Sequence, residues 1–178
     1  MNIDSLIDDV LRREGGFVDH PADRGGATNY GITRTTLAHW RGTTSVSAED
    51  VETMTRDEAR AIYRARYFIE PKIDTLPLRI QPQLFDMAVN HGPKKAVRML
   101  QETLNAEGYG PLNTDGILGP VTRLLAENAE RSLDGRLNNA LVNTRICFYR
   151  NIVAANPSQR VFLKGWLRRA EEFRERTS

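Results

Sequence analysis

Three carboxylates near the N-terminus have the types and spacing that acid-assisted bond cleavage requires. Glu14 follows Val10 by four residues and Leu11 by three, so on a helix it would continue the apolar face. Burial there, together with the partial negative charge of the helix C-terminus, would favour a protonated Glu14. Asp19 and Asp23 lie in a polar, glycine-rich loop and should stay ionised. In glycosidic cleavage, an acid protonates the departing sugar oxygen while a carboxylate positions water or stabilises the transition state.

The loop that follows Glu14 has a composition suited to binding a sugar. Its repeated glycines let the backbone approach a bulky saccharide and reach positive φ. Thr28, Asn29 and Tyr30 then supply a hydroxyl, an amide and an aromatic surface. The same residues are also compatible with a surface glutamate at a helix end, followed by a cluster of turns. The residues alone leave both interpretations open.

The order of residues in this segment forms a long motif. It consists of Glu14-Gly15-Gly16 and then Asp23-x-Gly25-Gly26-x-Thr28-Asn29-x-Gly31-Ile32-Thr33. This motif resembles the opening signature of family 108 glycoside hydrolases, the N-acetylmuramidase-like endolysins and secretion-associated muramidases of phages and bacteria. The resemblance implies a lysozyme-like helical fold, bacterial peptidoglycan as the substrate and Glu14 as the catalytic acid. It also favours Asp23 as the second carboxylate.

Later segments extend the resemblance over nearly the whole chain. Tyr63-x-x-x-Tyr67 and Phe85-Asp86-x-x-Val89-Asn90-x-Gly92 are similar to further segments of the same family. Residues from about 96 to 173 resemble the predicted peptidoglycan-binding region that usually follows it. We therefore expect a glycoside hydrolase region over residues 1–92 and a helical peptidoglycan-binding region over residues 93–178, packed together as one compact unit.

A second resemblance, to phage-type lysozymes, concerns the partners of Glu14. In those enzymes an Asp or Cys follows the Glu after eight intervening residues, and a Thr follows after five more. Glu14 and Asp23 fit this spacing, but only four residues lie between Asp23 and Thr28. Thr28 is therefore a candidate catalytic residue with Asp19 and Thr33 as the nearest rivals for the base and its partner.

The elements that must position these residues are mostly helical. An apolar repeat predicts a helix from about residue 3 to Glu14, stopped by Gly15. Residues 15–33 read as a functional loop, with a possible small β-hairpin. Thr33 can cap a helix through Trp40, and two further helices should begin at capping boxes, Ser47 with Asp50 and Thr55 with Glu58.

The second half of the chain predicts longer helices. Pro82 and Pro93 should each open a helix, with Gly92 as the stop between them. Residues 108–119 are rich in turn formers, and Pro120 could open the next helix, followed by helices near 133–155 and 158–174. Asp86 and Asn90 share one helix face, where they could line a substrate cleft or form hydrogen bonds within the core. Trp40 and Trp166 could stack on sugars, but both fall at apolar helical positions, which favours burial in the core.

Composition excludes several classes of protein. Cys147 is the only cysteine and lies in an apolar run, so we expect it to pack as a small hydrophobe without a disulfide or a catalytic role. The histidines lack zinc-binding spacing and no phosphate-binding glycine motif is present, so neither a metal nor a cofactor is predicted.

The charge differs between the two halves of the chain. Residues 1–90 hold 11 basic and 14 acidic side chains, against 14 and 9 in residues 91–178. A basic second half suits an anionic partner, although this imbalance is also typical of a solvated helical surface.

These observations together predict a mainly α, lysozyme-like muramidase. It would hydrolyse the β-1,4 bond between N-acetylmuramic acid and N-acetylglucosamine, act as a monomer, and need neither nucleic acid nor stable membrane insertion. Asp19, Asn29, Tyr30, Asp86 and Asn90 are the candidate substrate-binding residues. The N-terminus shows no Sec signal, so we expect synthesis in the bacterial cytoplasm and delivery to the wall through a holin or a dedicated exporter. The alternatives are a lytic transglycosylase, or a non-catalytic wall-binding or membrane-active module that uses the basic tail 164–169.

Overall fold

The structure, a computed structural model, describes residues 2–19 and 26–175. The chain forms two compact units, Met1–Arg66 and Tyr67–Ser178, each of which is described by itself. In the described residues the secondary structure is helical except for one two-stranded antiparallel hairpin. This confirms the expected mainly α fold and its small hairpin. None of the described helices has the length and apolar character needed to cross a membrane.

The first unit consists of short helices around the hairpin. Its elements are α1 (Ile3–Glu14), β1 (Thr28–Asn29), β2 (Ile32–Thr33), α2 (Arg34–Trp40), α3 (Ala48–Glu52) and α4 (Arg56–Arg64). Thr28 pairs with Thr33 and Asn29 with Ile32, and an isolated bridge joins Val18 to Thr28. The hairpin is therefore tied to the chain that leaves α1.

Helix starts in this unit follow the capping rules with one exception. Thr33 accepts a hydrogen bond from the Thr36 amide, and Ser47 and Asp50 form a reciprocal capping box. Thr55 likewise accepts from the Glu58 amide. The Glu58 carboxylate, however, pairs with Arg41, with an Nη2 to Oε2 distance of 2.8 Å. The expected second capping box is therefore only half formed, because a guanidinium outcompetes a backbone amide for that carboxylate.

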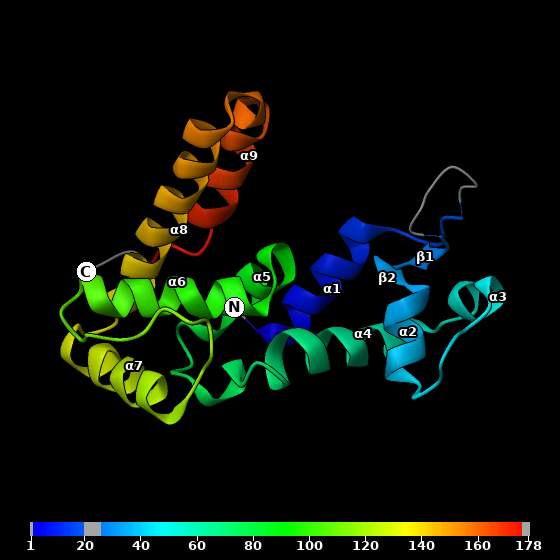
Figure 1. The fold of residues 1–178 in the computed structure, drawn as a ribbon, viewed down its shortest axis with the longest axis horizontal. Helices are drawn as coiled ribbons and strands as arrows, with labels where there is room; N and C mark the ends of the chain where they lie inside the picture. Colours follow the sequence, from blue (N-terminus) through cyan, green and yellow to red (C-terminus); the bar gives the residue numbers. More distant parts are fainter. Residues whose placement is uncertain (1, 20–25, 176–178) are drawn as a thin grey trace. The chain divides into compact units, whose positions relative to one another are not determined.

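Helices α1 and α4 pack against each other (Figure 1). The buried stripe of α1 consists of Ile3, Leu6, Ile7, Val10 and Leu11, as its apolar repeat predicts. Beside this stripe, acidic residues of α1 face basic residues of α4. Asp8 bonds to Arg56 at 2.9 Å and to Arg60 at 2.7 Å, and Asp4 pairs with Arg64. These pairs fix how α1 lies along α4.

The second unit holds the longer helices. Its α-helices are α5 (Gln81–His91), α6 (Pro93–Ala106), α7 (Pro120–Ser132), α8 (Arg136–Ala155) and α9 (Arg160–Glu171). The π-helical segment η1 (Ala65–Ile69) leads in from the first unit, and the short 3₁₀ helices are η2 (Ile73–Thr75) and η3 (Pro157–Gln159). Gly92, at φ 82°, separates α5 from α6, as expected. Figure 1 shows α8 and α9 as an antiparallel pair joined at η3.

The expected domain boundary at Gly92 does not coincide with the division between the compact units. That division falls between Arg66 and Tyr67, because α5 packs closely against α6. Leu84, Phe85 and Ala88 of α5 are all fully buried. The expectation that the two regions pack as one unit stays a prediction.

The turn-rich segment after α6 is organised by one buried amide. Gln101 donates through Nε2 to Asp115 Oδ1 at 2.9 Å and to the Ile117 carbonyl at 3.2 Å. Its Oε1 accepts from the Gly116 amide at 2.9 Å. The hydrogen bond from Gln101 lowers the pKa of the Asp115 carboxyl below its ordinary value. Asp115 thus serves a tight turn before α7.

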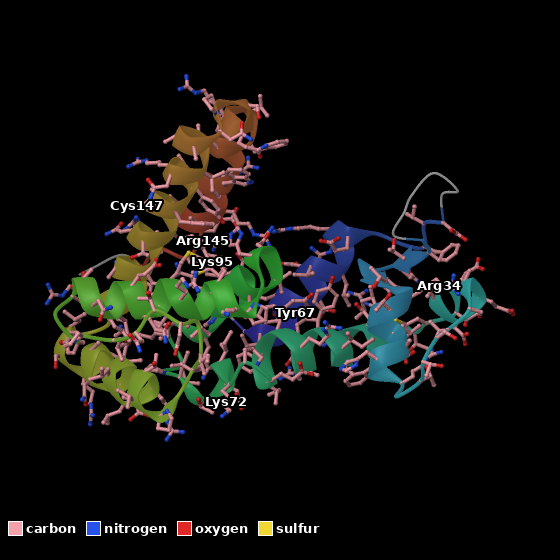
Figure 2. All side chains as sticks on the ribbon, viewed as in Figure 1. Arg34, Tyr67, Lys72, Lys95, Arg145 and Cys147 are labelled. Atoms are coloured by element: carbon pink, nitrogen blue, oxygen red, sulfur yellow. The ribbon has the colours of Figure 1, made fainter. Side chains whose placement is uncertain are left out.

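Two expectations about burial are wrong. Cys147 is exposed, and Figure 2 shows it on α8, the helix that also carries the buried Arg145. Trp40 is 40% exposed at the end of α2. Apolar neighbours in sequence did not bury these residues, because each points away from the core face of its helix. Trp166 is half-buried, with its ring centroid 5.4 Å from that of Tyr149.

Candidate active site

Glu14 is the last residue of α1, and Gly15, at φ 78°, ends the helix. Val10 and Leu11, one turn earlier, are buried, whereas Glu14 is exposed. The expectation that the apolar face buries Glu14 is therefore wrong. That face stops at Leu11 because residues 12–19 are all exposed. Glu14 instead presents its carboxyl group where a substrate can reach it.

The carboxyl group of Glu14 lies over the turn of the hairpin. A Cβ atom placed on Gly31 would lie 2.9 Å from Glu14 Oε2 and 2.9 Å from the hydroxyl oxygen of Tyr63. Both oxygens therefore lie close to the same face of Gly31, no farther apart than twice that distance. Ordinary van der Waals contact begins near 3.4 Å, so no side chain fits at position 31 without displacing one of them.

The turn itself has an unusual backbone. Tyr30 and Gly31, the two residues between the paired Asn29 and Ile32, have φ of 51° and 73°. Positive φ at both central positions is the pattern of a type I′ turn, which suits the twist of a two-residue hairpin. A tyrosine rarely adopts it. The Tyr63 hydroxyl donates to the Tyr30 carbonyl at 3.0 Å, which ties the turn to α4.

Asn29 anchors the hairpin from a buried position. It is 5% exposed, and its amide nitrogen donates to the Val51 carbonyl at 3.0 Å and to the Glu52 carbonyl at 3.1 Å. These bonds satisfy two carbonyls at the end of α3. Substrate binding by Asn29 stays a prediction, and the contacts in this structure are all within the protein.

Three further candidate residues, Asp19, Thr28 and Tyr30, follow Glu14 closely in the sequence. Thr28 is half-buried and exchanges backbone hydrogen bonds of 2.8 Å with Val18. Tyr30 is half-buried, and Asp19, which follows Val18, is exposed. The structure thus places these three residues on or beside the hairpin whose turn contacts Glu14. Asp23 lies outside the described residues.

Asp86 belongs to the second unit, where it is the centre of an ion cluster. It is 4% exposed, and Oδ2 accepts from Arg145 Nη2 at 2.5 Å. Arg169 donates to Oδ1 through Nη2 at 2.7 Å. Both carboxylate oxygens thus accept hydrogen bonds within the core, which is the other role that the sequence left open, and substrate binding by Asp86 stays a prediction. Asn90 is exposed and donates its amide to the Asp86 carbonyl at 2.5 Å, so its side chain bonds to the backbone of its own helix one turn earlier.

The same cluster continues to a histidine. Arg145 Nε donates to the Tyr149 hydroxyl at 2.9 Å, and that hydroxyl lies 2.9 Å from His91 Nε2. Since the hydroxyl oxygen accepts from Arg145, its own proton is free to be donated to His91. Burial, and then the charge of Arg145, lowers the pKa of His91 to about 4. His91 is accordingly neutral near pH 7.

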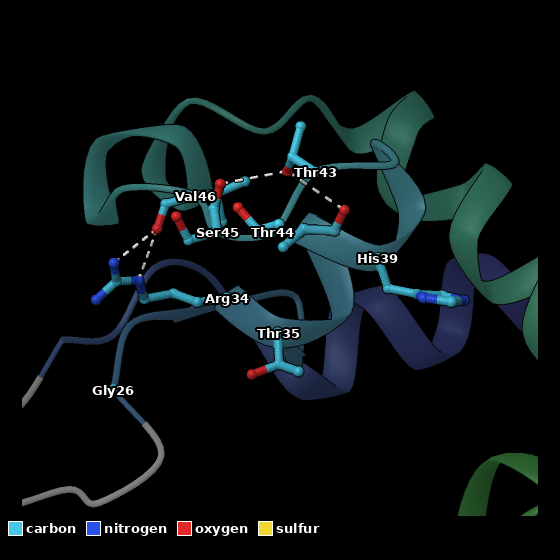
Figure 3. Close-up of a pocket in the computed structure, with 9 residues that line it drawn as sticks. Gly26, Arg34, Thr35, His39, Thr43, Thr44, Ser45 and Val46 are labelled. Atoms are coloured by element: carbon cyan, nitrogen blue, oxygen red, sulfur yellow. Dashed lines mark hydrogen bonds between the residues drawn. The ribbon is translucent and has the colours of Figure 1, made fainter.

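A hollow of about 480 Å³ also lies in the first unit (Figure 3). It is lined by Gly26, Arg34, Thr35, Ala38, His39, Thr43, Thr44, Ser45 and Val46. Arg34 donates through Nε and Nη2 to the Val46 carbonyl, at 3.0 and 2.6 Å. The lining residues offer hydroxyls and a cation but no carboxylate. In the described part of the chain, no three His, Cys, Asp or Glu side chains are grouped to hold a metal ion.

Three residues of the first unit, Tyr63, Gly31 and Arg34, received no functional role from the sequence. Tyr63 lies in a segment that resembles the family, but nothing in the spacing shows that its hydroxyl lies beside Gly31, as the Glu14 carboxyl group does. Gly31 is part of the motif, where it can be read as a turn former. Only the tertiary structure shows that the Glu14 carboxyl group lies against it. Arg34, beside the hollow, gave no signal at all.

Comparison with known proteins adds independent findings. Residues 7–92 match the family model described as Glycosyl hydrolase 108, and residues 95–171 match the one described as Predicted Peptidoglycan domain. A solved structure of SagA from Brucella abortus is 33% identical, with a TM-score of 0.68. The match covers 95% of this chain and 89% of that chain. None of the curated proteins compared with the chain is similar to it.

Proposed function

The chain belongs to the glycosyl hydrolase 108 family, and from that premise we propose that it is a muramidase that cleaves the glycan of bacterial peptidoglycan. The second matched region, described as a peptidoglycan domain, supports the same substrate. The proposed bond is the β-1,4 linkage between N-acetylmuramic acid and N-acetylglucosamine.

The observation that carries this proposal is the placement of Glu14. Its carboxyl group is exposed at the end of α1, yet it is held over Gly31 and near the Tyr63 hydroxyl. A general acid must reach the departing oxygen while its own position stays fixed. Ion pairs at Asp4 and Asp8 hold α1 against α4, and the Tyr63 hydroxyl holds the turn that Glu14 faces, so the site is compatible with both requirements.

In the proposed reaction, Glu14 gives its proton to the glycosidic oxygen as the bond to the departing sugar breaks. The sugar ring left behind carries oxocarbenium-like positive charge. A carboxylate of the following loop then stabilises this charge or activates water, and Asp23 is our first candidate. Asp19 is the alternative, and Thr28 would position the water.

The central test replaces Glu14 with Gln, which keeps shape and polarity but cannot act as an acid. Turnover of purified peptidoglycan should fall by roughly 10²-fold or more, the usual scale for loss of general acid catalysis. Glu52→Gln, the same change at an exposed glutamate on α3, should retain activity. Circular dichroism and thermal melting of both variants would verify the fold. Near wild-type turnover by Glu14→Gln would refute the assignment.

The products identify the bond and the reaction type. Mass spectrometry of the released muropeptides should show reducing-end N-acetylmuramic acid, with one water added for each bond cleaved. Products ending in anhydro-muramic acid would mean that the enzyme is a lytic transglycosylase. Reducing-end N-acetylglucosamine would mean that it cleaves the other glycosidic bond.

A further inference from the structure

Helices α8 and α9 lie in a long stretch without acidic residues. Residues 135–170 contain seven Arg and Lys side chains and no Asp or Glu. Two of the seven, Arg145 and Arg169, share the single negative charge of Asp86. The other five are exposed and form no ion pair within the described chain: Arg136, Arg150, Arg160, Lys164 and Arg168. This part of the second unit therefore presents uncompensated positive charge.

Three of these cations form a row on α9. Arg160, Lys164 and Arg168 are spaced by four residues, so they lie one above another on the same side of the helix. Like charges at this spacing destabilise a helix. Of the first two acids beyond the row, Glu171 is paired with Arg174, and Glu172 lies one turn after Arg168, so Arg160 and Lys164 have no acid within a turn of them on α9. An anionic partner would relieve the repulsion within the row.

Apolar side chains of α9 are exposed at the edge of the row and farther round the helix. Val161, three residues before Lys164 and therefore close to the row, is 77% exposed. Phe162, two residues from both Arg160 and Lys164, lies on another side of the helix and is 53% exposed. The Phe162 ring stacks on Trp166, with centroids 5.8 Å apart and planes 24° apart. Ala170 is the only residue of α9 that is buried. The helix thus offers cations, an aliphatic side chain and an aromatic pair together.

We propose that the α8–α9 hairpin docks on the surface of an anionic lipid bilayer. With α9 lying in the plane of the interface, Val161 and Phe162 would enter the boundary between headgroups and acyl chains, while the long side chains of the cation row, on the polar face, would reach the phosphates of the headgroups. A soluble polyanion would satisfy the cations but would leave both apolar side chains in water. The docking is peripheral, because neither helix has the length and apolar character of a membrane span. This proposal does not rest on the hydrolase assignment.

Flotation of the full chain with vesicles tests the proposal. The protein should float with vesicles of equal parts phosphatidylglycerol and phosphatidylcholine, but not with phosphatidylcholine alone, and added salt should release it. Each cation near such a surface contributes roughly fivefold in binding. Replacing Arg160, Lys164 and Arg168 together with Gln should therefore weaken binding by about 100-fold. The matched control makes the same change at Lys94, Arg123 and Arg131, exposed cations of α6 and α7, and should bind nearly as well as the parent.

Fluorescence reports whether the hairpin itself enters the interface. In a Trp40→Phe background, Trp166 is the only tryptophan, and its emission should shift to the blue when anionic vesicles are added. Val161→Ser with Phe162→Ser should reduce that shift while leaving salt-sensitive binding in place. Glu14→Gln should bind vesicles normally, which separates this test from the test of catalysis.

Three results would overturn the proposal. The first is equal binding, or none, to anionic and zwitterionic vesicles. The second is loss of binding to purified peptidoglycan, and not to vesicles, in the α9 triple variant, which would make the row a wall contact. The third is concentration-dependent dimerisation abolished by Phe162→Ser, which would assign the face to a second copy of the chain.

Discussion

Gly31→Ala tests the arrangement of the site most directly, because it adds one methyl group beneath Glu14. The new Cβ would lie 2.9 Å from Glu14 Oε2, 2.9 Å from the Tyr63 hydroxyl and 3.1 Å from Glu14 Cδ. Each distance is shorter than ordinary contact, so Glu14, Tyr63 or the turn must move. Gly42→Ala is a matched control, since Gly42 has φ 67° and no atom within 4 Å of the added Cβ.

Both variants place an alanine at positive φ, but only one of them brings the new methyl group against other atoms. An alanine at positive φ costs roughly 1–2 kcal/mol at either position. Only Gly31→Ala adds the steric conflict, which requires a shift of about half an ångström or more at Glu14 or its neighbour. A misplacement approaching 1 Å at a reacting group can cost roughly 10²-fold in rate. We therefore expect similar losses of stability but a kcat lower by about 10- to 100-fold for Gly31→Ala alone.

Chemical denaturation supplies the free energy of unfolding, and release of muropeptides from purified peptidoglycan supplies kcat. Adding Tyr63→Phe to Gly31→Ala removes one of the two clashing oxygens and should restore part of the activity. Equal activity of Gly31→Ala and Gly42→Ala, at comparable stability, would show that the Glu14 carboxyl group does not act from its place over the turn.

Further predictions concern the second unit and the second carboxylate. Asp86→Asn should lower the free energy of unfolding by about 3–5 kcal/mol, because it leaves the fully buried Arg145 without its counter-charge. Calorimetry checks this, and lost activity at an unchanged melting temperature would instead make Asp86 a site residue. The pKa of His91 is lowered to about 4 from 6.5, so the unfolded chain takes up the proton first as the pH falls. Stability should therefore be complete above pH 6.5 and decline towards pH 4 by at most about 3 kcal/mol, a decline that His91→Gln should lack in pH-dependent denaturation. Asp23→Asn should reduce turnover more than Asp19→Asn, and the reverse order in the muropeptide assay would move the base to Asp19.

Local signals in the sequence predicted the elements of the fold well. Thr33 and Ser47 cap the helices expected of them, and Gly92 and Pro93 divide two helices where their backbone preferences require. These effects act within about one helical turn, so neighbouring residues are enough to reveal them. Glu58 is a case that neighbouring residues do not reveal. Its carboxylate pairs with Arg41, 17 residues away, instead of with the backbone amide of the N-cap residue Thr55.

The site was harder to predict, because burial and partners are tertiary properties. Glu14 continues the period of the apolar face, but periodicity does not show where a face loses its cover. Asp86 shares a helix face with Asn90, but its arginine partners lie 59 and 83 residues away. Asn29 likewise carries an amide suited to a sugar, but that amide donates to a backbone carbonyl of α3. The sequence shows which functional groups these side chains carry, and only the fold shows which of those groups are already hydrogen-bonded within the protein.

The ion pairs between α1 and α4 have a consequence for how the length of the chain can vary. Asp4 and Asp8 fix the rotation of α1 at one end, and Glu14 inherits that rotation six residues beyond Asp8. One residue inserted or deleted between Asp8 and Glu14 would turn the carboxyl group by about 100° and move it by about 1.5 Å along the axis. Substitutions on the outer face of α1 do not change the rotation of Glu14 about the helix axis relative to Asp4 and Asp8. We therefore expect related chains to vary freely in the outer residues of this helix while keeping the interval from Asp8 to Glu14 at constant length.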